Sequence, residues 1–183
     1  QLTSIISMSG HSHWSGIKHK KEATDKKKGK IFSKLLKAIT IAVGTEPNPQ
    51  FNAKLRAVID KAKENQVPAD NIERAIKRAS EVGENLEELL MEAYGPEGVA
   101  ILIEAITDSR NRTISEVKKI LKDNDAKWAD PGSVQWTFER GANGWQAKFK
   151  QQISDSGKEK LQKLINDLEE HDDAQEVVTN IEL

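Results

Sequence analysis

The residues best suited to chemistry lie near the start of the chain, where lysines alternate with imidazole and indole side chains. Residues 1–40 contain nine lysines and two acidic residues. Clustered lysines attract polyanions in a salt-sensitive, sequence-independent way, because binding releases condensed counterions. The rings can stack on bases. We therefore predict a nucleic-acid-binding segment, and a solvated basic arm without a ligand is the alternative that lysine runs more commonly represent.

The predicted nucleic-acid-binding set also includes cations further along the chain. Arg110 and Arg112, in the sequence DSRNRT, precede a predicted helix, where guanidinium groups and unbonded N–H groups can hold a phosphate. Pairing of one arginine with Asp108 is the equally weighted alternative. The full predicted set is His11, His13, Trp14, Lys18, His19, Lys20, Lys21, Lys26, Lys27, Lys28, Lys30, Lys34, Lys37, Arg56, Lys61, Arg110 and Arg112.

The four tryptophans divide into two predicted roles. Trp14 and Trp128 are candidate stacking platforms for bases. Trp136 and Trp145 flank a predicted hairpin, so we expect them to be core residues or cross-strand partners.

Catalytic and metal-binding patterns are weak. Three histidines near the start could act as metal ligands or general bases, but the nearby carboxylates are only Glu22 and Asp25, and the chain has no cysteine and no HExxH motif. Ser133 lies outside any GxSxG motif, and GPEG at 95–98 is too short for a phosphate-binding loop. We predict no enzyme activity, no cofactor and no metal site.

Composition favours a globular intracellular protein. The chain has 183 residues, of which 37% are hydrophobic, and this is enough for a substantial core. The sequence contains no run of about 20 apolar residues that could span a bilayer. We expect a cytoplasmic monomer with no membrane partner. Residues 1–7 precede Met8, and we interpret them as an artificial extension or an upstream remnant.

Charge divides the chain into two parts. Residues 1–80 carry 16 basic and 7 acidic side chains, whereas residues 81–183 carry 12 basic and 22 acidic ones. This asymmetry predicts two domains with different surfaces. We place a basic helical domain with an N-terminal arm at 8–82 and an acidic α/β domain at 83–183.

The basic part has the periodicity of three helices. Apolar residues recur every three or four positions over residues 26–43 and 51–64. A third helix follows Pro68, with Asp70 as the predicted N-cap and Glu73 completing a capping box. Such short helices predict a compact three-helix bundle.

The acidic part has alternating and continuous apolar runs typical of strands. We predict a helix from Thr113, with Glu116 completing its capping box, to Asp123. The other predicted elements are strands at 86–94, 99–107, 133–138 and 145–153, a turn at 141–144, a helix at 157–170 and a closing strand from 174. From Val99 the order is strand, helix, strand, strand, helix, strand. This order predicts an α+β, ferredoxin-like split βαβ arrangement with one extra strand before it.

Four segments in order carry a family resemblance: GHSHWSGIKHKKEATDKKKGKIFSKLLKAI, NAKLRAVIDKAKENQVPADNIERAIKRA, YGPEGVAILIEAITDSRNRT and GSVQWTFER. Together they resemble the YebC/PmpR family, which includes mitochondrial translational activators of cytochrome oxidase subunit I. Members of that family usually have a further α/β domain after the FER motif. Here Arg140 leads through GANG directly to Trp145, so we expect a shortened form that lacks one domain.

The resemblance implies a regulator of gene expression that binds nucleic acid, namely a probable DNA-binding transcriptional regulator. The alternative is a factor associated with the ribosome or ribosomal RNA that activates translation or relieves stalling. Lysine patches contact phosphates, which position a protein without specifying sequence, and this slightly favours RNA as the physical target. An enzyme that uses the N-terminal histidines is the third and weakest reading.

Overall fold

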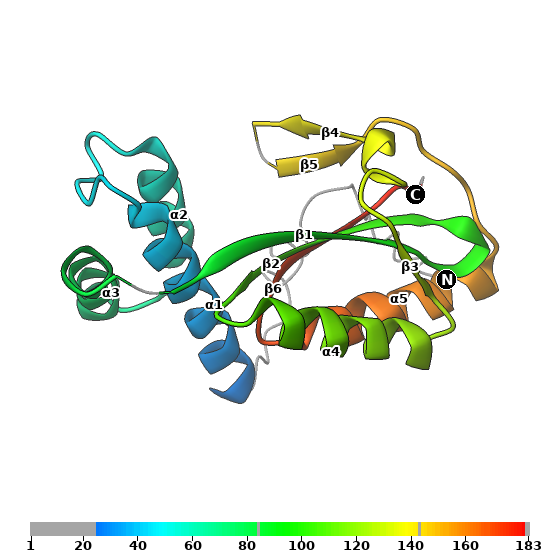
Figure 1. Cartoon of the computed structure of the whole chain (residues 1–183), viewed down its shortest axis with the longest axis horizontal. Helices are drawn as coiled ribbons and strands as arrows, with labels where there is room; N and C mark the ends of the chain where they lie inside the picture. The colour runs from blue at the N-terminus through cyan, green and yellow to red at the C-terminus, as the bar shows by residue number, and fades with distance from the viewer. Residues whose placement is uncertain (1–24, 84, 143, 182–183) are drawn as a thin grey trace, which may run out of the picture. The chain divides into compact units, whose positions relative to one another are not determined.

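The structure is a computed structural model that describes residues 25–83, 85–142 and 144–181. Its described residues form two compact units (Figure 1). Within the described residues, one unit comprises those from 25 to 88 together with 106–110, and the other comprises 89–105 and the residues from 111 to 181. The predicted domain limits, 8–82 and 83–183, stay predictions. Among the described residues, no helix is both long and apolar enough to cross a membrane.

The helical unit contains α1 (Asp25–Val43), α2 (Ala53–Glu64) and α3 (Ala69–Glu81). Helix α1 packs against both other helices. Its apolar stripe buries Leu35 and Ile39, which share the core with Leu55 of α2 and Ile72 of α3. The three predicted helices are therefore confirmed as the basic part of the fold.

The start of α3 differs from the prediction. The helix begins at Ala69 with Pro68 in the N-cap position and no side-chain cap. Pro68 has φ −59°, which suits the entry to a helix, and proline has no N–H to leave unbonded. Asp70 therefore lies in the first turn and is not the cap, although its negative charge still favours the helix N-terminus.

The second unit is built on a four-stranded sheet with the order β3-β1-β2-β6. The strands are β1 (Glu87–Tyr94), β2 (Ala100–Thr107), β3 (Lys127–Ala129) and β6 (Ala174–Thr179), and β3 and β6 run antiparallel to their neighbours. A short 3-10 turn, Pro96–Gly98, joins β1 to β2. Two helices, α4 (Arg110–Asp123) and α5 (Asp155–Glu169), complete the mixed α+β architecture, and the predicted class is confirmed.

The strand assignment differs from the ferredoxin-like prediction in two places. The strand expected as an extra, β1, lies in the middle of the sheet beside β2. The strand expected at 133–138 is not part of this sheet, because Gln135–Thr137 forms a 3-10 turn and β4 (Phe138–Gly141) pairs with β5 (Gly144–Ala147) in a separate hairpin. The edge position belongs to β3, whose three residues are too few to show strand periodicity.

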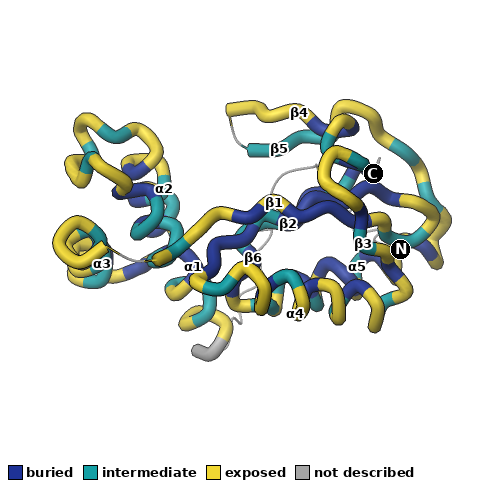
Figure 2. The backbone as a smooth tube through the Cα atoms, viewed as in Figure 1, coloured by how far each residue is buried: buried dark blue, intermediate teal, exposed yellow. Residues whose placement is uncertain are grey.

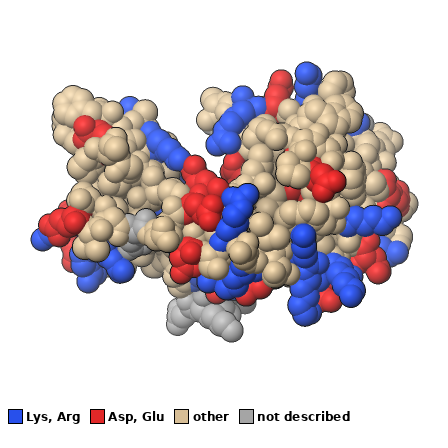
Figure 3. Space-filling view, viewed as in Figure 1, with Lys and Arg blue, Asp and Glu red and all other residues tan. Residues whose placement is uncertain are grey.

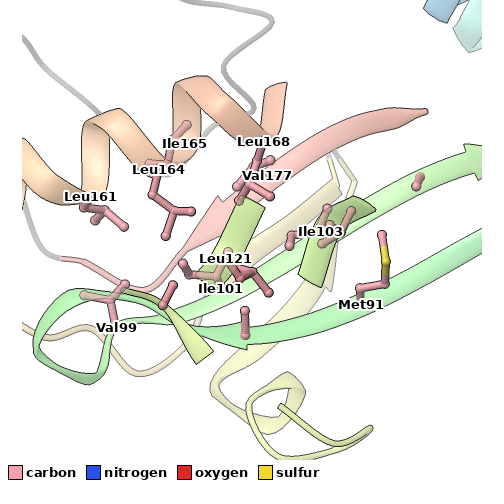
Figure 4. Packing of buried hydrophobic residues seen from close by; sticks show 14 of the residues in the cluster. Met91, Val99, Ile101, Ile103, Leu121, Leu161, Leu164, Ile165, Leu168 and Val177 are labelled. Atoms are coloured by element: carbon pink, nitrogen blue, oxygen red, sulfur yellow. The ribbon is translucent and has the colours of Figure 1, made fainter. Parts of the chain in front are cut away.

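Alternation along the strands explains why both faces of the sheet are covered. One set of side chains, including Ile101 and Ile103 of β2, packs against Leu161, Leu164 and Leu168 of α5 (Figure 4). The opposite set, including Ala100 and Leu102, packs against Phe138 and residues of the β4–β5 hairpin. Helices α4 and α5 thus lie on one face and the hairpin on the other (Figure 1). Strand β2 is buried along almost its whole length (Figure 2).

Candidate nucleic-acid interface

Positive charge in the helical unit is concentrated on α1 and α2. Helix α1 has six lysines and one acidic residue, α2 has four cations and two acidic residues, and α3 has three of each. Of the described lysines of α1, Lys27 and Lys28 are exposed and Lys30 and Lys37 are half-buried. The first turns of α1 therefore present an exposed cationic surface at the end of the chain segment with the highest lysine content.

Lys34, a member of the predicted nucleic-acid-binding set, is buried in the structure. It is only 5% exposed. Helix α1 packs against both α2 and α3, so its buried arc is wider than a single apolar stripe requires. Long lysine stems tolerate such burial because their methylene groups pack against apolar neighbours.

Several predicted site residues lie outside the described part of the chain. These residues are His11, His13, Trp14, Lys18, His19, Lys20 and Lys21. Lys26 belongs to α1, which places it in the same helix as Lys27 and Lys28. The sequence prediction for these residues stays a prediction.

The cations of α2 have different roles. The Arg56 guanidinium donates to the carbonyl oxygens of Pro49 at 2.9 Å and Gln50 at 3.3 Å, so it braces the loop before its own helix. Lys61 is half-buried, whereas Lys63 is exposed. Within the described residues, the Lys63 ammonium group has no recorded ion pair. Lys63 is thus a better candidate for phosphate contact than Arg56, and periodicity alone did not distinguish them.

Asn52 holds the junction between α1 and α2. Its side-chain oxygen accepts from the Leu55 N–H at 2.9 Å and caps α2. Its amide nitrogen donates to the carbonyl oxygens of Ala42 at 2.7 Å and Glu46 at 2.8 Å, at and beyond the end of α1. One side chain therefore satisfies groups at two helix ends, which fixes α1 relative to α2 within the helical unit.

Arg110 and Arg112 each pair with a carboxylate from a distant part of the sequence. Arg110 lies 3.2 Å from Glu87, and both side chains are exposed. Arg112 donates to Asp173 at 2.6 Å, and the Asp173 side chain is only 4% exposed. The Arg112–Asp173 contact has the geometry of a strong charge-assisted hydrogen bond, which favours a structural role for Arg112.

Asp173 is the centre of a polar network that the sequence did not predict. The Thr113 hydroxyl donates to it at 2.7 Å, so Thr113 is a buried residue within α4 and not the predicted N-cap. The His171 Nδ1 accepts from the Asp173 N–H at 3.1 Å. The ring proton therefore lies on Nε2, which is 2.8 Å from Glu116. The Glu116 carboxylate thus accepts a hydrogen bond from His171 and does not complete a capping box.

Glu116, His171 and Asp173 also have the composition of a metal site, with one donor atom from each residue lying within 4.8 Å of the others. Arg112 and Thr113 already donate to Asp173, and the His171 proton points to Glu116. A cation would have to displace these donors. The arrangement therefore serves best as an internal network that ties α4 to the start of β6.

The tryptophans are placed differently from the prediction in two of the described cases. Trp128 packs against the main core, and the Lys118 ammonium lies 4.7 Å from its ring centroid, so it is not an open stacking platform. Trp145 packs against the second core cluster, as predicted. Trp136 was expected to be a core residue or a cross-strand partner, but its side chain is 62% exposed. Trp136 lies in a 3-10 turn and not in a strand.

Glu97 and Asp167, both in the second unit, have shifted pKa values. Hydrogen bonds from the Ser154 hydroxyl and N–H hold the pKa of Glu97 below its ordinary value. Hydrogen bonds from Lys163 and Asn124 lower the pKa of Asp167 in the same way. Each group is stabilised as the anion by its donors, which is a structural effect and not the raised pKa of a general acid.

The described residues thus combine a lysine-rich three-helix unit that has exposed cations with an α+β unit, an arrangement suited to binding an anionic partner. Two family models match the chain: the TACO1/YebC protein N-terminal domain at residues 12–82, and the TACO1/YebC second and third domain at residues 86–143. The chain belongs to the TACO1/YebC family, and the predicted resemblance to the YebC/PmpR family is confirmed.

Curated relatives share one name. A probable transcriptional regulatory protein of Brachyspira hyodysenteriae is 52% identical over 139 residues, which is 74% of this chain and 56% of the relative. A protein of the same name from Desulfosudis oleivorans is 40% identical over 178 residues, which is 96% of this chain and 72% of the relative. The chain spans about half the length of most of these relatives. The expected absence of one α/β domain stays a prediction.

The fold has a solved counterpart. The crystal structure of a conserved hypothetical protein from Aquifex aeolicus matches with a TM-score of 0.81 and 32% sequence identity. The match covers 93% of this chain and 97% of that one. The arrangement of helices and strands described above is therefore that of a known family structure.

Proposed function

We propose that this chain is a nucleic-acid-binding regulator of gene expression, acting as a DNA-binding transcriptional regulator. The observation that carries the proposal is the set of six lysines on α1, of which Lys27 and Lys28 are exposed, directly after the lysine-rich segment at the start of the chain. Such a surface binds phosphates through charge. The name of the curated relatives, probable transcriptional regulatory protein, supports DNA as the target.

The proposed role is architectural. The basic segment and α1 make the main electrostatic contact with the phosphate backbone. Lysines read phosphates and not base edges, so sequence preference must come from other contacts or from DNA shape. No catalytic step is required for such a role, and a cytoplasmic location suits it.

Ribosomal RNA is the second candidate target. Lys27, Lys28 and Lys63 contact phosphates of DNA and RNA with equal chemistry, and no helix in the described residues has a recognised base-reading motif. In this case the protein would act as a translation factor on the ribosome. The same cationic surface would be used.

The test is a binding titration at several salt concentrations with duplex DNA, structured ribosomal RNA and intact ribosomes. The informative variant is Lys27→Gln with Lys28→Gln. The matched control is Lys119→Gln with Lys122→Gln, which removes the same charge from the exposed surface of α4. We expect the α1 variant to make the negative slope of the logarithm of the binding constant against the logarithm of salt concentration less steep by about 2, or one per lost phosphate contact. The α4 control should leave the slope unchanged.

The identity of the preferred ligand separates the two candidates. Preference for one DNA sequence over random duplex supports transcription. Preference for ribosomes or ribosomal RNA that persists at high salt supports translation. Equal loss of affinity in the α1 variant and in the α4 control would overturn the proposed site.

A further inference from the structure

The second unit carries an exposed pair of aromatic side chains beside the β4–β5 hairpin. Trp136 is 62% exposed and Phe149 is 50% exposed. Their ring centroids lie 5.6 Å apart with an interplanar angle of 50°. Single exposed apolar residues are ordinary, but two large rings in contact on the surface form a patch that can bind a ligand.

Hydrogen bonds hold the Trp136 ring and the backbone at Phe149 in place. The Trp136 indole N–H donates to the Ser133 carbonyl oxygen at 2.8 Å. The Phe149 backbone N–H donates to the Thr137 carbonyl oxygen at 3.1 Å, which ties the segment after β5 to the turn before β4. The turn is itself fixed by the buried Glu92 carboxylate, which accepts from the Gln135 N–H at 3.0 Å. The aromatic pair is therefore preorganised, and little conformational entropy would be lost on binding.

The surroundings of the pair are basic although this half of the chain is acidic. Residues 135–151 contain Arg140, Lys148 and Lys150 and one acidic residue, Glu139. All three cations are exposed, and the Lys148 ammonium lies 5.4 Å from the Phe149 ring centroid. Arg140 also pairs with Glu104 at 3.1 Å. Lys and Arg side chains are visible around the hairpin in Figure 3. Aromatic faces next to positive charge are complementary to a base with its phosphate.

We propose that Trp136 and Phe149 form a stacking platform for the bases of a single-stranded nucleic acid, with Lys148 and Lys150 contacting its phosphates. The 50° tilt between the rings suits two consecutive bases of a flexible strand, because neighbouring bases in a duplex stay parallel. The inference rests on the proposed function, since it adds a second contact to a nucleic-acid-binding protein. The proposed platform gives the second unit a direct role in binding nucleic acid.

The experiment compares Trp136→Ala with the wild-type chain in titrations of a 12-nucleotide single strand and a 12-base-pair duplex. Loss of one stacking contact weakens binding by roughly 5- to 150-fold. We expect a loss in this range for the single strand and less than about twofold for the duplex, whose bases are already stacked. Trp136→Phe keeps a stacking ring and should restore most of the affinity.

Phe51→Ala is the matched control, because Phe51 is an exposed aromatic residue of the helical unit, at 76% exposure. It should not change single-strand affinity. Circular dichroism and sedimentation of each variant report folding and self-association. Unchanged single-strand affinity in folded Trp136→Ala overturns the proposed stacking platform. The proposal also fails if the only effect of the substitution is to dissociate a dimer or to release a bound protein. If the wild-type chain binds neither ligand, the proposed function fails together with this inference.

Discussion

The contact between Arg112 and Asp173 gives a sharp test of whether Arg112 serves the fold or the nucleic acid. The Arg112 side chain is 44% exposed, whereas the Asp173 side chain is 4% exposed. Hydrogen bonds to charged groups contribute about 1.5–3 kcal/mol. Because Arg112 is partly solvated, we take the lower part of that range and expect Arg112→Ala to reduce the free energy of unfolding by about 2 kcal/mol.

Arg110 is a close control for this prediction. It is two residues away, carries the same charge and pairs with Glu87, but both of those side chains are exposed, at 59% and 47%. Surface ion pairs contribute about 0–1 kcal/mol. Arg110→Ala should therefore lower the free energy of unfolding by less than about 1 kcal/mol.

The assay is urea unfolding followed by tryptophan fluorescence, combined with the salt-dependent binding titration. A double-mutant cycle with Asp173→Asn isolates the coupling between the two side chains, which should exceed about 1 kcal/mol. The melting temperature of Arg112→Ala should fall by about 4–8 °C, given the size of the chain. Equal stability of Arg112→Ala and Arg110→Ala, with weakened nucleic-acid binding in the former only, would refute the structural role.

Two further predictions concern helix ends. Asn52→Ala removes the cap of α2 and the hydrogen bonds to the carbonyl oxygens of Ala42 and Glu46, so the free energy of unfolding should fall by about 2–3 kcal/mol. Asn48→Ala loses one exposed turn contact and should lower it by less than about 1 kcal/mol. Similar values for the two variants in denaturant titrations would contradict the role of Asn52 at the α1–α2 junction. Glu97 has a lowered pKa in the folded protein, so its contribution to stability is present above the ordinary Glu value of about 4.3 and is lost as pH falls through the lowered value. Glu97→Gln should remove this part of the acid-induced loss of stability, and identical pH profiles of the two proteins would count against it.

Most helices and strands could be predicted from the sequence because their patterns are long. The stripe with Leu35 and Ile39 predicts α1, and the run from Val99 predicts β2, whose side chains alternate between two cores. Helix starts were less predictable. Asp70 and Thr113 both have the residue types of capping boxes, but Pro68 starts α3 earlier and the Thr113 hydroxyl bonds to Asp173 instead. Local patterns do not show such long-range partners.

The candidate site was predictable in its charge but not in its geometry. The lysine density of α1 is plain in the sequence, whereas the burial of Lys34 is a result of tertiary packing that the sequence pattern does not show. The exposure of Trp136 depends on a 3-10 turn within a sequence that alternates like a strand. The contacts of Asp173 join residues about 60 positions apart, which no periodicity reports.

The central claim is that the basic N-terminal part of the chain binds the nucleic-acid backbone. The most direct measurement is the salt dependence of affinity for the intact chain and for a variant without residues 8–21, using duplex DNA and ribosomal RNA in parallel. We predict steep salt dependence for the intact chain and loss of binding in the shortened, still folded variant, because this deletion removes Lys18, Lys20 and Lys21 together with Trp14 and three histidines. Unchanged affinity and an unchanged salt slope after the deletion would contradict the claim.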